Sequence, residues 1–135
     1  MKAQQATSAK RFIDLHTGIS MSNFMVKFMV LFGKPSDQAE FENTYNDFFA
    51  LVERMPNISR RQVIDVQGSP IGETRLFRIL EIYFEDRDAM DAALRSKAGQ
   101  EAGDELRRFE AGTFEMVFAE VYEEAGGSTP NGTEK

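Results

Sequence analysis

Cysteine is absent from the 135 residues of this sequence, so disulfide bonds, thiolate nucleophiles and zinc–thiolate sites are excluded. There is one histidine, His16, and the carboxylates are scattered, so no metal site and no cofactor are predicted. No apolar run approaches the roughly 18 residues that a membrane span needs. The first 21 residues also lack the apolar segment of a secretory signal. We therefore expect a cytoplasmic protein that does not bind membranes.

The chain has fewer basic than acidic residues: its 16 lysines and arginines and 22 acidic residues give a net charge of -6. Nucleic acids and anionic lipid surfaces repel such a chain, so neither is expected as a partner. Tryptophan is also absent, but there are 12 phenylalanines. They predict a well-filled aromatic core or an apolar cavity.

The chain divides into three parts. Residues 1–23 show no sustained periodicity and are predicted to be a flexible extension. Residues 24–124 carry all the periodic segments and form one domain, and residues 125–135 have the composition of a disordered tail.

The first half of the domain predicts a strand and a helix. Residues 24–32 are almost continuously apolar, which predicts a buried strand. Lys27 interrupts it, either reaching solvent near the strand end or placing a charge in a pocket. Ser36 is the expected N-cap of the helix, and Pro56 ends it. The apolar side chains of this helix recur at helical spacing: Phe41, Tyr45, Phe48, Val52 and Met55.

The second half predicts a hairpin, two helices and a last strand. The hairpin strands are residues 58–68 and 76–84, joined by a turn rich in glycine. A helix opening at Asp86 is followed by a short helix that kinks off it near Ser96. Residues 114–123 alternate and form the last strand.

The order strand, helix, strand, strand, helix, strand predicts an α+β fold of the ferredoxin-like βαββαβ type. Its four-stranded antiparallel sheet carries the helices on one face. The strands are apolar on both faces, so an isolated domain would expose a large apolar patch. A homodimer whose two sheets close into a barrel, with its interior as a cavity, solves that problem.

The sequence resembles the EthD family of dimeric α+β barrel proteins. The resemblance is carried by residues 26–35, 55–58, 78–84 and 94–96, and by these single positions: Phe41, Tyr45, Gly99, Asp104 and Phe109. It implies a homodimer with an apolar cavity between the sheet and the helices of each subunit. It also implies a link to ether degradation by a haem monooxygenase system, or a kinship with cofactor-free monooxygenases, isomerases and cyclases.

One position departs from the family pattern. Members commonly carry a histidine in the first helix, where this chain has Phe48 or Phe49. A first-helix imidazole is therefore unavailable for proton transfer or for binding haem iron.

Glu81 is the first candidate for a functional residue, because it interrupts an apolar strand row and an unpaired buried carboxylate is costly. It is either a polar anchor that acts as a general acid or base in a cavity, or one half of a salt bridge with Arg60, Arg61 or Arg78. Tyr83 shares its row and is the second catalytic candidate. The predicted ligand pocket consists of Met29, Phe32, Tyr45, Phe48, Phe49, Glu81, Tyr83 and Phe118, although most of these side chains also suit a plain core.

The sequence and the family resemblance suggest three possible functions. The first is binding of a small apolar or aromatic molecule in a cavity between sheet and helices, in support of a catabolic monooxygenase system. The alternative is a cofactor-free enzyme acting on an aromatic or lactone-like substrate through Glu81 and a tyrosine. A dimeric structural module with a filled barrel is the third.

Overall fold

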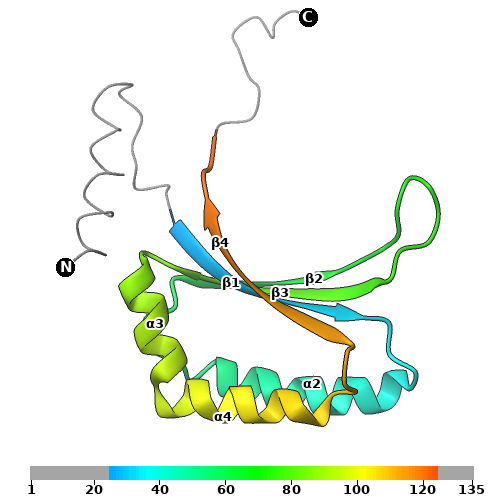
Figure 1. Ribbon diagram of the computed structural model, residues 1–135, viewed down its shortest axis with the longest axis horizontal. Coiled ribbons are helices and arrows are strands. Elements are labelled where there is room, and N and C mark those ends of the chain that lie inside the picture. The colour runs from blue at the N-terminus through cyan, green and yellow to red at the C-terminus, as the bar shows by residue number, and fades with distance from the viewer. Residues whose placement is uncertain (1–24, 125–135) are drawn as a thin grey trace, which may run out of the picture.

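The computed structural model describes residues 25–124, which form one sheet with a layer of helices beneath it (Figure 1). The predictions for residues 1–23 and 125–135, and His16 among them, lie outside the described residues. The elements in chain order are β1 (Met25–Gly33), α2 (Gln38–Val52), β2 (Arg60–Asp65), β3 (Leu76–Phe84), α3 (Arg87–Arg95), α4 (Lys97–Glu105), the 3-10 turn η2 (Leu106–Arg108) and β4 (Phe114–Val121). This order confirms the predicted ferredoxin-like βαββαβ fold.

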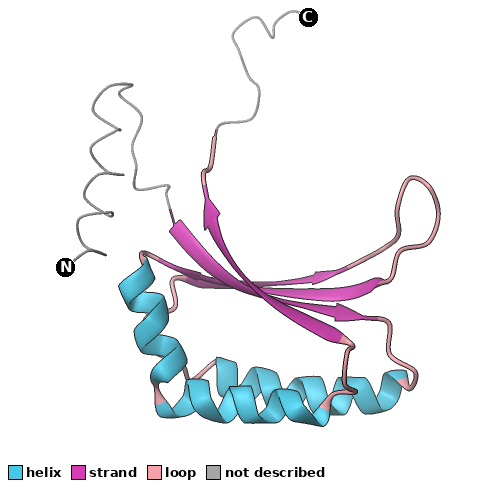
Figure 2. Ribbon diagram, viewed as in Figure 1, coloured by secondary structure: helices cyan, strands magenta, loops and turns pink. Residues whose placement is uncertain are grey.

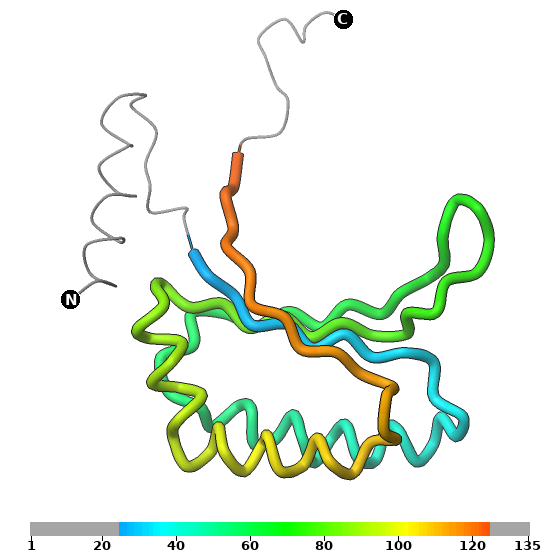
Figure 3. Tube along the Cα trace, in the orientation of Figure 1, coloured from blue at the N-terminus to red at the C-terminus, as the bar shows by residue number. Residues whose placement is uncertain are grey.

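The four strands are antiparallel neighbours in the order β2-β3-β1-β4. The central strand β1 places Val30 opposite Leu80 of β3 and opposite Met116 of β4. The strand β2 is shorter than the predicted residues 58–68. Backbone hydrogen bonds from Ser59 to Tyr83 and from Val66 to Phe77 nevertheless continue the β2–β3 pairing at both ends. The hairpin loop between β2 and β3 projects beyond the sheet (Figure 3).

All described helices cover the same face of the sheet, and no described element covers the other face (Figure 2). Side-chain burial alternates along β1, and its fully buried row contacts the helical layer. The same side of β3 carries Leu80, Ile82 and Phe84, none of which is exposed. We call the opposite side the open face.

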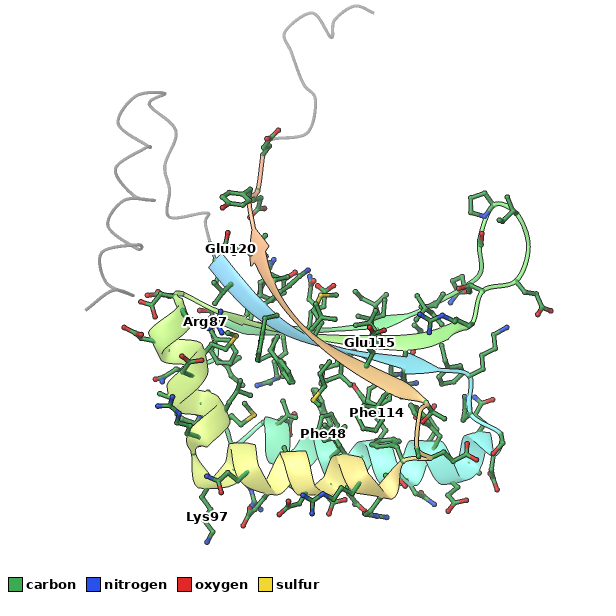
Figure 4. The ribbon with its side chains drawn as sticks, in the orientation of Figure 1. Phe48, Arg87, Lys97, Phe114, Glu115 and Glu120 are labelled. Carbon is green, nitrogen blue, oxygen red and sulfur yellow. The ribbon has the colours of Figure 1, made fainter. Side chains whose placement is uncertain are left out.

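An aromatic core fills the layer between sheet and helices. The ring of Phe32 lies at the centre of this core, with centroid distances of 5.0 to 6.3 Å to its neighbours, which are Phe41, Tyr45, Phe48, Phe109 and Phe114. Figure 4 shows Phe48 and Phe114 in this layer, between the sheet and the helices. Such ring pairs each add about 0.5–1.5 kcal/mol beyond the area that they bury.

The N-cap of α2 is Asp37, so the prediction of Ser36 was wrong. Asp37 has extended backbone angles, and its carboxylate accepts a hydrogen bond of 3.1 Å from the amide of Glu40. The Ser36 hydroxyl instead donates to the carboxylate of Glu110, 74 positions away along the chain.

The predicted kink at Ser96 is confirmed. Ser96 ends α3 and caps α4, because its hydroxyl accepts a hydrogen bond from the amide of Gly99. The chain turns sharply there (Figure 1). The turn brings the backbone of Gly99 against the carbonyl groups of Ala93 and Leu94, which leaves no room for a Cβ atom.

Candidate functional site on the open face

On the open face, the strand register places side chains of neighbouring strands in rows that cross the sheet. One row across the sheet runs Arg60, Tyr83, Lys27 and Ala119. The adjacent row runs Gln62, Glu81, Met29 and Val117. Each strand contributes to both rows because side chains two positions apart share a face.

Three of these side chains form a hydrogen-bonded group, which we call the open-face triad: Lys27, Glu81 and Tyr83. The Tyr83 hydroxyl donates to Glu81 Oε1 at 2.7 Å, and Lys27 Nζ lies 3.2 Å from Glu81 Oε2. Glu81 is only 7% exposed and Tyr83 5%. A buried carboxylate is tolerated here because both of its oxygens have a partner.

Two residues of β2 border the triad. The guanidinium of Arg60 lies 4.2 Å from the centroid of the Tyr83 ring, which is the distance of a cation–π contact. The side-chain amide oxygen of Gln62 lies 3.4 Å from the Tyr83 hydroxyl. The phenol has one proton, which its shorter bond to Glu81 uses, so its oxygen can still accept a hydrogen bond.

The arginines predicted as partners of Glu81 bind elsewhere, so this part of the prediction was wrong. Arg78 points to the helical layer, and Arg61 approaches Glu53 at 4.0 Å. Lys27 takes their place because the register puts it diagonally across from Glu81 on the neighbouring strand. Lys27 does not extend into solvent, as the first interpretation had it: its side chain is 17% exposed and its ammonium pairs with Glu81.

Arg78 forms a second polar cluster, on the helix side. It binds Glu42 through two nitrogens at 2.9 Å each and Asp65 through Nε at 2.8 Å. Burial lowers the pKa of Arg78, but the hydrogen bonds to the two carboxylates outweigh it and raise this pKa overall. The cluster therefore fastens α2 to β2 and β3.

Tyr45 lies beside this second cluster. The guanidinium of Arg78 is 4.6 Å from its ring centroid, and its buried hydroxyl has no hydrogen-bond partner among the described residues. Burial raises the pKa of Tyr45 to about 12, and the charge of Arg78 opposes part of that shift.

The side chains predicted to line one pocket lie on two sides of the sheet. Met29, Glu81 and Tyr83 share the open face. The other five members lie on the helix side: Phe32, Tyr45, Phe48 and Phe49 in or beside the aromatic core, and Phe118 half exposed against Phe28. Gln62 was missing from the prediction, and Arg60 was named only as an ion-pair partner of Glu81. Cross-strand pairing with β3 would have indicated both as neighbours of the triad.

Two cavities lie at the ends of the helical layer. One of about 110 Å³ lies between the start of α2 and the segment after η2, with Phe41 and Phe109 in its wall. A wider groove of about 380 Å³ lies at the kink, beside Arg54 and Lys97. Residues 25–124 contain no group of three side chains suited to hold a metal ion. They also contain no helix long and apolar enough to cross a membrane.

The chemistry available to the open-face triad is hydrogen bonding and proton transfer. A group that hydrogen-bonds to the Tyr83 oxygen is linked through the phenol proton to the Glu81 carboxylate. Lys27 balances the charge of that carboxylate.

No protein-family model matches the sequence, and neither does any curated protein. Solved structures do match it. An EthD (ethyl tert-butyl ether D) family protein from Bacillus halodurans shares 26% identity with a TM-score of 0.69, over 73% of this chain and 99% of that one. This match confirms the resemblance to the EthD family.

Two other solved structures show the same fold. SnoaB from Streptomyces nogalater, a cofactor-independent oxygenase, is 16% identical with a TM-score of 0.55, over 78% of this chain and 99% of its own. A dimeric protein of unknown function with a ferredoxin-like fold, from Bacteroides fragilis, is 21% identical with a TM-score of 0.54. This match covers 72% of this chain and 96% of that one.

Proposed function

We propose that the protein is a homodimer whose two open faces meet and form a barrel. The open face carries partly exposed apolar side chains on all four strands and is covered by no described element, so pairing would remove this apolar surface from water. The Bacteroides fragilis relative is described as dimeric, which supports this arrangement.

The function that the geometry supports best is binding of a small apolar or aromatic molecule inside this barrel. The observation that carries the proposal is the open-face triad, a hydrogen-bonded polar group next to the apolar side chains of Met29, Val117 and Ala119. Binding sites combine apolar walls with a few fixed polar groups in this way. The helix side suits an apolar ligand less well. Aromatic rings already fill its centre, the cavity beside the start of α2 holds only about 110 Å³, and the wider groove at the kink is lined mostly by polar side chains. Following the EthD resemblance, the bound molecule would belong to a catabolic monooxygenase system.

A second candidate function is proton transfer without a cofactor, and the 2.7 Å hydrogen bond between Tyr83 and Glu81 favours it. A substrate proton would pass to the Tyr83 oxygen while the phenol proton moves to Glu81 Oε1. The substrate anion would then remain beside the cations of Lys27 and Arg60. The fold is shared with a cofactor-independent oxygenase, which is consistent with such a reaction.

Mass spectrometry of the native protein, with the Glu81→Gln variant beside it, tests the proposal. We expect a dimer of two 15.3 kDa chains that retains a small molecule, and we expect Glu81→Gln to lower its occupancy. The matched control is Glu115→Gln, an exposed carboxylate on the same face, 4.0 Å from Arg75, that should leave occupancy unchanged. Equal occupancy in both variants would remove the triad from the binding site.

A further inference from the structure

We propose that the ligand of the open face carries an anionic oxygen at one end of a flat apolar body, and that Arg60 binds this oxygen. The inference rests on the proposed function, since it names the chemical class of the molecule that the barrel would hold. It gives Arg60 a role in specificity that is separate from the triad.

Arg60 is held over the site but is not neutralised. Its guanidinium stacks on the Tyr83 ring at 4.2 Å, and its side chain is exposed. No carboxylate within residues 25–124 forms an ion pair with it, whereas Arg61 and Arg78, further along the two hairpin strands, both have acidic partners. A guanidinium stacked on a ring keeps its N–H donors along its edge, where they can bind an oxyanion.

The charges of the site leave one positive charge in excess. Lys27 and Arg60 are cations, Glu81 is the acidic member, and Lys27 is already paired with it. This excess occurs in a chain whose net charge is -6. A local positive charge that runs against the overall balance attracts an anion to this one part of the sheet.

The apolar half of the site adjoins the polar half. In the first row, Ala119 of β4 follows Lys27. In the second row, Met29 of β1 and Val117 of β4 follow Glu81. The edge on the β2 side is therefore cationic, and the surface on the β4 side is apolar. A flat molecule with a carboxylate or phenolate oxygen at one end matches that order.

Isothermal titration calorimetry on the full chain tests the inference with a matched pair of probes, 2-naphthoate and its neutral analogue 2-naphthamide. A hydrogen bond to a charged group predicts that the wild type prefers 2-naphthoate by about tenfold or more. Arg60→Gln should abolish this preference without changing the affinity for 2-naphthamide, and Arg60→Lys should restore part of it. Arg54→Gln, an exposed arginine near the kink, is the control and should behave as the wild type.

Three results would overturn the inference. If both probes bind equally well to the wild type, the site holds an apolar molecule and the proposed function stands without a role for Arg60. If Arg60→Gln weakens the dimer in sedimentation experiments while the preference persists, Arg60 pairs with the second copy. If neither probe binds the wild type, the proposed binding function fails together with the inference.

Discussion

The kink between α3 and α4 gives the sharpest test of the fold, through the substitution Gly99→Ala. A Cβ atom at this position would overlap the carbonyl oxygen of Ala93 and lie 2.7 Å from the carbonyl oxygen of Leu94. Both are backbone atoms, so no side chain can rotate away. Overpacking of this kind costs about 1–3 kcal/mol.

The same helix offers its own control at Gly103, where an added Cβ meets nothing within 4 Å. Because alanine favours helix over glycine, Gly103→Ala should stabilise the protein by about 0.5–1 kcal/mol. The two variants should therefore differ by about 1.5–4 kcal/mol in the free energy of unfolding.

Equilibrium urea unfolding, followed by circular dichroism at one fixed protein concentration, measures this difference. The concentration is held constant because the stability of a dimer depends on it. Equal unfolding midpoints for Gly99→Ala and Gly103→Ala would mean that the kink has room for a Cβ atom at position 99, contrary to the structure.

Two further predictions concern α2. Asp37→Ala removes the N-cap and should lower the free energy of unfolding, measured in urea, by about 1 kcal/mol. Ser36→Ala should lower it by less than half of that amount. The reverse order would show that Ser36 is the cap. Tyr45→Phe removes a buried hydroxyl without a partner and should be neutral or stabilising at pH 7. Because burial raises the pKa of Tyr45 to about 12, the unfolded chain loses this proton from about pH 10 while the folded chain keeps it, so wild-type stability falls between these values. Between pH 7 and pH 11, the free energy of unfolding should fall by about 1 kcal/mol more for the wild type than for Tyr45→Phe. Parallel curves of unfolding free energy against pH for the two proteins would contradict this.

The sequence predicted the fold well because its elements carry strong local signals. The aromatic stripe of α2, the apolar run of β3 and the serine at the kink each indicate a local structure without information from the rest of the chain. The N-cap was missed because Ser36 and Asp37 are adjacent and both suit the position. Only the backbone angles of the folded chain distinguish them, and these are extended at Asp37.

The site was harder to predict, for a reason that lies in β1. Both of its side-chain rows are largely apolar, so alternation alone does not show which row faces the helices. The predicted pocket therefore combined Phe32, which lies in the core, with Met29, which lies on the open face. The pairing of Glu81 with Lys27 depends on the register between two strands about 50 residues apart, which local patterns do not contain.

In the proposed dimer, two open faces meet and enclose the triad. Mass spectrometry of the native protein as purified tests this arrangement, because it reports the number of chains and any retained molecule together. We expect a dimer of 15.3 kDa chains with added mass from a small molecule. A monomer at micromolar concentration would contradict it, because the apolar open face would then lie uncovered in water.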